Sequence, residues 1–328
     1  MAAKFKIVFL DKGYFPSIQP MQEAVAPVGG EVIDVSVKTD EDIIAAARDA
    51  DVVLTILPKV QPKAIQAFER CRLITRMGIG YDEVDVQAAT EKGIMVCNVA
   101  DYCHEEVSDH ALTLLLTAVR KVKTFDENMR AGIWGFRHVR PMYEIRGKTL
   151  GLVAFGKIAR RLAPKAQGLG LRVIAYDPYL YDDIFTQWGV ERRLDLEDLL
   201  TESDFVSVHA PFTLETRGMI GEAEFRKMKP AAYFVNTSRG AVVNEEALLK
   251  ALHEGWIAGA ALDVMVEEPL PVTSPLLKAP NLILTPHASW YTEKSIEVLI
   301  QNAMADVVRA LQGKRPKNLV NPQVLWNK

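Results

Sequence analysis

Three side chains that stand far apart in the chain could together bind an anion and transfer a proton. Arg239 ends the run Asn-Thr-Ser-Arg before Gly240, Glu268 precedes a proline, and His287 follows Thr-Pro. A guanidinium presents a planar fork that matches a carboxylate, and an imidazole is the commonest general acid in proteins. These residue types therefore predict catalysis on a small carboxylate.

A glycine-containing turn upstream could hold a dinucleotide. The order is a strand, a turn through Gly156, a helix, and a second strand that ends at Asp177. In dinucleotide folds, N–H groups at the helix start approach the pyrophosphate and the acid accepts from the adenosine ribose hydroxyls. Asp177 predicts NAD over NADP, because a carboxylate repels a 2′-phosphate. Ala154 and Ala159 replace two glycines of the full fingerprint, so an ordinary strand-to-helix turn is the alternative for this motif alone. Together with the anion site, the turn predicts hydride transfer to or from a nicotinamide.

Composition excludes several classes of protein. With 328 residues, 49% of them hydrophobic and 25% charged, the chain has the composition of a soluble globular protein of two domains. The net charge is −3 and the basic residues are dispersed, so nucleic acid is not expected as a partner. No stretch approaches membrane-spanning length, so no membrane association is expected. Cys71, Cys97 and Cys103 share no metal-type spacing and form no disulfide framework. We therefore expect no metal site and a cytoplasmic location.

The hydrophobic pattern alternates between strands and helices in two series, which predicts an α/β fold with parallel sheets. Strands are predicted at residues 6–10, 31–37, 51–57, 73–77 and 94–99, and then at 149–155, 172–176, 205–209, 233–236, 258–263 and 282–285. The second series has the strand number of a Rossmann sheet. One long helix is predicted over residues 105–130, as a bridge between domains or a dimer arm, and the last helix over residues 293–312.

Several short segments, in their order and spacing, resemble the signatures of the D-isomer-specific 2-hydroxyacid dehydrogenase family. They are residues 78–82 (Gly-Ile-Gly-Tyr-Asp), 151–159, 236–240 (Asn-Thr-Ser-Arg-Gly), 262–264 (Leu-Asp-Val), 268–269 (Glu-Pro) and 285–287 (Thr-Pro-His). The similarity covers nearly the whole chain. Within the family, residues 96–99 and 285–293 most resemble the C-terminal-binding-protein corepressor branch, which keeps the dehydrogenase active-site plan.

The resemblance implies catalytic and substrate-binding roles. His287 would protonate the keto oxygen of a 2-oxo acid as hydride arrives, and would act as the base in the reverse direction. Glu268 would hold the ring and favour its protonated form. Arg239 would bind the substrate carboxylate, together with the N–H groups of Ile79 and Gly80 from the other domain. The implied reaction interconverts a 2-oxo acid and a D-2-hydroxy acid, with NAD as the cofactor and NADP as the second choice.

The resemblance also implies a set of cofactor-binding residues. Lys157 would lie at the pyrophosphate and Asp263 would face the nicotinamide. The full set is Val107, Gly156, Lys157, Ile158, Asp177, His209, Ala210, Pro211, Thr216, Thr237, Ser238 and Asp263.

Two domains are implied by the same resemblance. Residues 1–99 and 293–328 would form the substrate-binding domain, and residues 100–292 an NAD-binding Rossmann domain inserted into it. The active site would lie in the cleft between them, and hinge closure would expel water before hydride transfer. We expect a homodimer that forms through the NAD-binding domain.

Trp290 has two interpretations, core packing or an aromatic wall of the substrate pocket. We favour the pocket, which predicts a 2-oxo acid with an apolar side chain over a phosphorylated or very small one. Four histidines, at positions 104, 110, 138 and 253, have no partner in a motif and are assigned no chemistry.

A second function, from another class, is an NAD(H)-sensing, corepressor-like interaction protein with residual dehydrogenase activity. The segment around Trp290 motivates this alternative. The intact Arg239, Glu268 and His287 favour the enzyme, because a sensor needs no proton donor.

Overall fold

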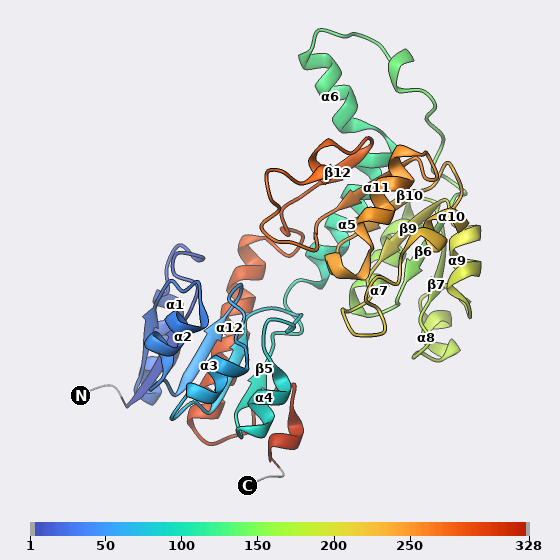
Figure 1. Cartoon of the computed structure of the whole chain (residues 1–328). Helices are drawn as coiled ribbons and strands as arrows, with labels where there is room; N and C mark the ends of the chain where they lie inside the picture. The colour runs from blue at the N-terminus through green and yellow to red at the C-terminus, as the bar shows by residue number, and fades with distance from the viewer. Residues whose placement is uncertain (1–3, 326–328) are drawn as a thin grey trace. The chain divides into compact units, whose positions relative to one another are not determined.

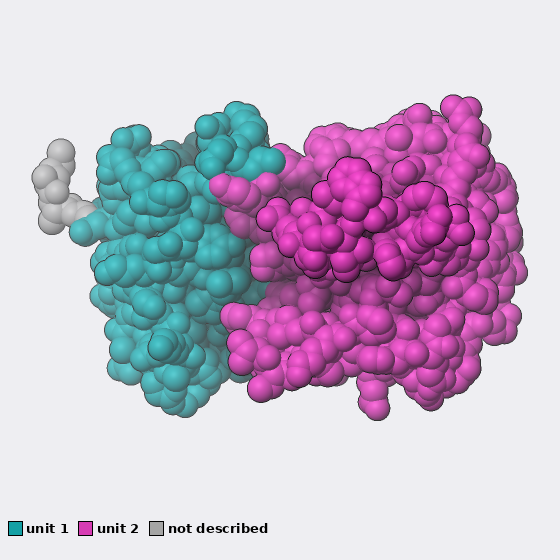
Figure 2. All heavy atoms as spheres, turned by 90° about the horizontal axis from the view of Figure 1, so that it is seen from above, with its two compact units in different colours: residues 1–102, 292–328 teal, residues 103–291 magenta. Residues whose placement is uncertain are grey.

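The computed structural model describes residues 4–325, which divide into two compact units, each with its own parallel sheet. Unit 1 contains the residues up to 102 and those from 292 onward, and unit 2 contains residues 103–291 (Figure 2). Unit 2 is therefore inserted into the sequence of unit 1. Among residues 4–325, every helix is too short or too polar to span a bilayer.

The sheet of unit 1 has five parallel strands in the order β2-β1-β3-β4-β5, the order of flavodoxin-like folds (Figure 1). β3 and β4 are buried along their whole length, which explains why they read as continuous apolar runs. The strands are β1 Phe5–Phe9, β2 Gly30–Asp34, β3 Val52–Thr55, β4 Leu73–Arg76 and β5 Met95–Cys97. The helices are α1 Gln19–Val25, α2 Asp40–Ala47, α3 Pro62–Ala67, α4 Val86–Glu91 and α12 Glu293–Leu311.

The sheet of unit 2 has seven parallel strands in the order β12-β11-β10-β9-β6-β7-β8. The strand order reverses between β6 and β9, which is where open α/β sheets bind ligands. The strands are β6 Thr149–Val153, β7 Arg172–Tyr176, β8 Glu191–Arg193, β9 Phe205–Val208, β10 Tyr233–Asn236, β11 Gly259–Leu262 and β12 Leu282–Leu284. The helices are α5 His104–Val119, α6 Val122–Arg130, α7 Lys157–Gly168, α8 Asp182–Gln187, α9 Leu196–Glu202, α10 Glu222–Lys227 and α11 Glu245–His253.

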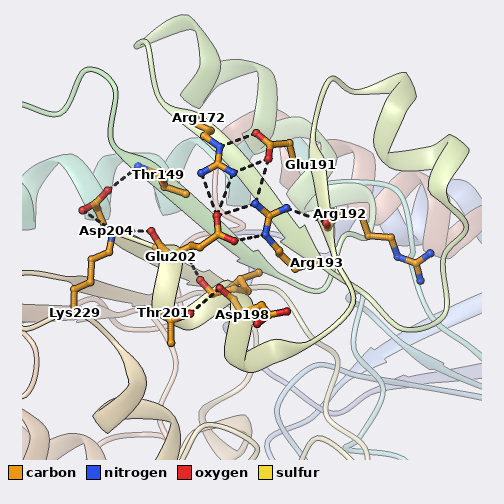
Figure 3. Close-up of polar contacts among 12 residues, drawn as sticks. Thr149, Arg172, Glu191, Arg192, Arg193, Asp198, Thr201, Glu202, Asp204 and Lys229 are labelled. Atoms are coloured by element: carbon orange, nitrogen blue, oxygen red, sulfur yellow. Dashed lines mark hydrogen bonds and ion pairs between the residues drawn. The ribbon is translucent and has the colours of Figure 1, made fainter.

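The predicted α/β fold is confirmed, and each predicted strand begins within one residue of its expected start. The sequence analysis missed β8, whose three residues are all charged. This edge strand is fixed by ion pairs: Arg172 and Arg193 both bind Glu191 and Glu202 (Figure 3). A strand held by charges at a sheet edge has no apolar alternation to reveal it.

The single helix predicted for residues 105–130 is wrong. The helix ends at Val119 and a second one, α6, starts at Val122. Between them Lys121 has φ 52°, in the left-handed region, and its Nζ donates to the carbonyl of Val139. Helix α6 and residues 131–145, here called the arm, project from the rest of unit 2 (Figure 1).

Candidate active site

The predicted site residues of unit 2 lie at one edge of its sheet. In a parallel sheet the carboxyl ends of all strands meet at the same edge, so residues distant in sequence come together there. Each of the following comes after the carboxyl end of a strand: Gly156 after β6, Asp177 after β7, His209 after β9, Thr237 to Arg239 after β10, Asp263 after β11 and His287 after β12.

His287 and Glu268 form a close pair. His287 Nδ1 lies 2.6 Å from Glu268 Oε2, and both side chains are 32% exposed. The N–H of Met265 donates to the other carboxylate oxygen, Oε1, at 2.9 Å. Glu268 is thus fixed on one side by backbone and on the other by the imidazole, which leaves the Nε2 side of the ring to face a reactant.

The electrostatics of the pair favour an ionised Glu268. Burial acts to raise the pKa of this carboxyl group, but the hydrogen bond and charge of His287, the Met265 N–H and the charge of Arg239 together lower it below its usual value. The structure therefore brings Arg239 close enough to Glu268 for their charges to interact.

A buried asparagine shapes the loop that carries Arg239. Asn236 is fully buried; its Oδ1 accepts from the N–H and the hydroxyl of Ser238, and its Nδ2 donates to the carbonyl of Arg239. Gly240 follows because a Cβ there would lie 2.0 Å from the carbonyl carbon of Met265. The loop thus packs directly on the backbone that leads to Glu268, which explains why only glycine fits after Arg239.

Asp263 holds the turn that carries His287. The Asp263 carboxylate is fully buried and accepts hydrogen bonds from the N–H groups of Ala288 and Ser289, both at 2.9 Å. The backbone carbonyl of Asp263 accepts from the N–H of His287 at 2.7 Å. His287 has φ 53°, a left-handed conformation that is costly for a residue with a side chain. Strained backbone of this kind persists only where neighbouring contacts hold it, and here the hydrogen bonds to Asp263 hold it.

Two glycines differ in their surroundings: Gly151 lies within β6, and Gly156 lies in the turn that follows it. A Cβ at Gly151 would lie 2.2 Å from Ser203 Oγ, so packing requires this glycine. A Cβ at Gly156 would meet no heavy atom of residues 4–325 within 4 Å, and its φ of −72° suits any residue. Packing within the described chain gives no reason for Gly156. Its place at the start of α7 fits close approach by a phosphate group.

Two further observations fit a dinucleotide at this edge. Asp177 accepts the N–H of Phe155 at 2.9 Å, so the acid lies directly beside the turn. Thr237 is 7% exposed, and its Oγ1 has no hydrogen-bond partner among residues 4–325. Buried hydroxyl groups are nearly always bonded in complete structures. The residues present therefore fit a dinucleotide with its phosphates at Gly156 and its ribose near Asp177.

The remaining predicted cofactor residues differ in their surroundings. Burial lowers the pKa of His209 to about 4, and its Nε2 contacts Ser207 Oγ at 2.9 Å. The Thr216 hydroxyl donates to the carbonyl of Pro211, so it shapes its own loop. Ala210 and Val107 are buried, Ile158 is partly buried and Lys157 is exposed at the first position of α7. The cofactor roles of these residues stay predictions.

Ile79 and Gly80 belong to unit 1 and follow β4. The Ile79 carbonyl accepts from Asn98 Nδ2 at 2.7 Å, which fixes this loop on its own unit. Trp290 lies on the His287 loop, with its Nε1 donating to the His287 carbonyl at 3.0 Å and its ring edge-on to Tyr291. The substrate roles of Ile79, Gly80 and Trp290 stay predictions.

The residues that shape these loops were not predicted from the sequence. Asn236 belongs to the motif of residues 236–240, but the sequence predicted no role of its own for it. An asparagine side chain often accepts from the backbone N–H two residues later and so forms a turn, as Asn236 does with Ser238. Thr285 and His110 also belong to the hydrogen-bonding around Asp263. No local pattern links residue 110 of α5 to residue 285, which follows β12, so only the tertiary structure reveals them.

Comparison with known proteins relates most of the chain to a family of dehydrogenases. A family model for the NAD-binding domain of D-isomer-specific 2-hydroxyacid dehydrogenases matches residues 112–289. A glyoxylate reductase of Korarchaeum cryptofilum is 40% identical over 287 residues, which are 86% of this chain and 86% of that protein.

Solved structures agree with this relation. D-lactate dehydrogenase from Aquifex aeolicus, complexed with NAD and lactic acid, is 27% identical with a TM-score of 0.85, over 96% of this chain and 98% of that one. An acyclic imino acid reductase in complex with NADPH and D-Arg is 26% identical with a TM-score of 0.86, over 96% and 99%. These relatives give no support to the corepressor-like branch or to the NAD(H)-sensing alternative.

Proposed function

Because the chain belongs to the D-isomer-specific 2-hydroxyacid dehydrogenase family and is an NAD-dependent oxidoreductase of 2-hydroxy acids, we propose that His287, Glu268 and Arg239 are its catalytic residues. The proposed reaction is the interconversion of a small 2-oxo acid and its D-2-hydroxy acid. The observation that carries this proposal is the 2.6 Å contact between His287 Nδ1 and Glu268, with Arg239 close enough to act on the same carboxylate.

The cofactor, when bound, supplies or accepts the hydride. Since Nδ1 of His287 faces Glu268, Nε2 delivers the proton to the keto oxygen of the substrate and removes it in the reverse direction. The ionised Glu268 stabilises the imidazolium and fixes its orientation. Arg239 binds the substrate carboxylate through two parallel hydrogen bonds, which orients the keto group toward His287.

The preferred cofactor is NAD(H). Asp177 supports this choice, because it lies beside the pyrophosphate turn and would repel the 2′-phosphate of NADP. A structural neighbour holds NADPH, so the assay should compare both nucleotides.

For the substrate, we propose glyoxylate or another small 2-oxo acid. The similarity to a glyoxylate reductase supports a very small substrate, whereas Trp290 favours one with an apolar side chain. The test is the loss of NADH absorbance with glyoxylate, hydroxypyruvate, pyruvate and phenylpyruvate, with NADPH in parallel. Turnover of any of these acids supports the proposal. If NADH binds but no 2-oxo acid is reduced, the proposed reaction is wrong.

We propose that the protein is a homodimer and that the arm forms its interface. The arm exposes Val122, Met129, Ile133, Trp134, Phe136 and Tyr143, and Trp134 is 85% exposed. Several large apolar side chains exposed on one segment support an interaction site there. We propose a second copy of the chain as the partner at this surface, because the two copies of a symmetric dimer present the same surface to each other.

Light scattering at micromolar concentration tests the dimer. A Trp134→Asp, Phe136→Asp variant should be a monomer, while Val272→Asp, at another exposed apolar residue, should remain a dimer. A monomeric wild type would contradict the proposal. We also propose a cytoplasmic location, which three free cysteines among residues 4–325 support.

A further inference from the structure

A hydrogen-bonded chain connects helix α5 to the turn that carries His287. His110 Nε2 lies 3.0 Å from Thr285 Oγ1, and Thr285 Oγ1 lies 2.6 Å from Asp263 Oδ1. His110 is only partly exposed, at 26% for its side chain, and lies 3.6 Å from the same Asp263 oxygen. The sequence analysis assigned no chemistry to His110.

The direction of each hydrogen bond follows from the proton count. The carboxylate of Asp263 only accepts, so the single hydroxyl proton of Thr285 is donated to it. Thr285 Oγ1 must then accept from His110, which requires a proton on His110 Nε2. His110 therefore donates a hydrogen bond to Thr285, and Thr285 donates one to Asp263.

Asp263 passes this constraint to the catalytic loop. Its two carboxylate oxygens accept the N–H groups of Ala288 and Ser289, and its carbonyl accepts that of His287. The left-handed backbone of His287 is strained and persists only where neighbouring contacts hold it. A shift of the Asp263 carboxylate would move the N–H groups on both sides of this strained residue. The hydrogen bond from Thr285, whose hydroxyl is in turn held by His110, limits such a shift.

We propose that His110 and Thr285 are positioning residues, which hold the Asp263 carboxylate so that His287 points its imidazole in the productive direction. The proposal rests on the proposed function only in treating His287 as the proton donor. His110 and Thr285 touch neither substrate nor cofactor in this account and act through Asp263 alone.

Variants that remove or keep each hydrogen bond test the proposal by steady-state kinetics. His110→Leu and Thr285→Val should each lower kcat about tenfold and leave the KM for the 2-oxo acid and the Kd for NADH within about twofold, because a misplaced catalytic group costs rate more than binding. His110→Gln, with an amide donor at the position of Nε2, and Thr285→Ser, with its hydroxyl, should recover most of kcat. The double variant His110→Leu, Thr285→Val should be no slower than Thr285→Val alone, because both bonds belong to one chain.

Two matched controls exclude a general effect of the substitutions. Thr113→Val changes an exposed threonine on the same helix, and His253→Leu changes an exposed histidine at the end of α11. Both should keep the wild-type kcat. Unchanged kcat in His110→Leu, or losses that simply multiply in the double variant, would overturn the proposal.

Nitrogen-15 NMR gives a readout that does not depend on activity and whose first part uses the wild-type protein alone. At neutral pH, His110 should show a protonated Nε2 whose hydrogen exchanges slowly with water, and this signal should change in Thr285→Val. A His110 ring with an unprotonated Nε2 would overturn the proposal even if the variants fail to fold. A wild type without turnover on any 2-oxo acid would instead refute the proposed function and leave the NMR test intact.

Discussion

Ala154 and His287 adopt left-handed backbone conformations in unit 2, at φ 67° and φ 53°. Both lie in turns that follow the carboxyl end of a strand, Ala154 after β6 and His287 after β12. A backbone hydrogen bond holds each residue. The N–H of Ala154 donates to the carbonyl of Tyr176, and the N–H of His287 donates to the carbonyl of Asp263. Strain in such turns is commonly retained for function, because it places the groups that act.

Replacing Ala154 by glycine should stabilise the protein. An L-residue in the left-handed region costs about 1–2 kcal/mol, and glycine loses roughly 0.5–1 kcal/mol in chain entropy, so the free energy of unfolding should rise by about 0.5–1 kcal/mol. Urea unfolding of Ala154→Gly measures the difference. The control Ala223→Gly, at an exposed position inside helix α10, should be destabilised by about 1 kcal/mol. A loss of stability in Ala154→Gly equal to that of the control would contradict the explanation.

At the scale of elements, β8 depends on charge where the other strands of unit 2 depend on burial. The carboxylate of Glu202, at the end of α9, accepts hydrogen bonds from Nε and Nη2 of Arg193 and from both Nη atoms of Arg172 (Figure 3). The hydrogen bonds and charges of these arginines lower the pKa of Glu191 to about 2 and that of Glu202 below its usual value, against the effect of burial. The network connects β7, β8 and α9 across the edge of the sheet.

Glu202→Gln should reduce the free energy of unfolding of unit 2 by about 1 kcal/mol, since solvent screens a partly exposed network and isolated surface pairs contribute less. The loss should shrink in 0.5 M NaCl, because salt weakens exposed ion pairs. Glu197→Gln, which breaks an exposed pair with Lys227 in the same unit, should have almost no effect. Equal effects of the two substitutions would show that the network acts no differently from a single surface pair.

Sequence predicted the elements that burial defines and missed those that depend on particular tertiary contacts. The strands from β1 to β12 other than β8 carry β-branched or apolar runs, so their pattern was sufficient. The break at Lys121 follows helix-forming residues and is fixed by a hydrogen bond to distant Val139, so local propensity gave no sign of it.

The residues of the site also fall into those that the sequence predicted and those that only tertiary contacts reveal. The types of Arg239, Glu268 and His287 and their motifs predicted the pair that the structure places 2.6 Å apart. The contacts of Asp263 with Thr285, and of Thr285 with His110, join residues separated by 22 and 175 positions. Such contacts depend on how α5, β11 and β12 pack, which no local motif encodes.

At the scale of the whole molecule, His209 should make stability depend on pH. Burial lowers the pKa of this ring from 6.5 to about 4 in the folded protein, so above pH 6.5 it is neutral in both states. As the pH falls from 6.5 toward 4, the unfolded chain binds a proton that the folded protein does not, and stability decreases by up to about 1.4 kcal/mol per pH unit.

Urea unfolding at several pH values between 7 and 4 measures this effect. His209→Gln should lose stability less steeply than the wild type over this range, while His253→Gln, at an exposed histidine, should follow the wild type. Parallel curves for wild type and His209→Gln would show that the ring is not shielded from water as the account requires.

His287, held by Glu268, is the proposed proton donor in the reduction of a 2-oxo acid. The most direct test is kcat for NADH-dependent reduction of the best 2-oxo acid by the wild type and by His287→Gln, with NADH binding measured in parallel. We expect a loss of about 10²- to 10⁴-fold in kcat, with the Kd for NADH within about twofold of the wild type, because general acid catalysis contributes this much to the rate. Near-normal turnover by His287→Gln would contradict the proposed role.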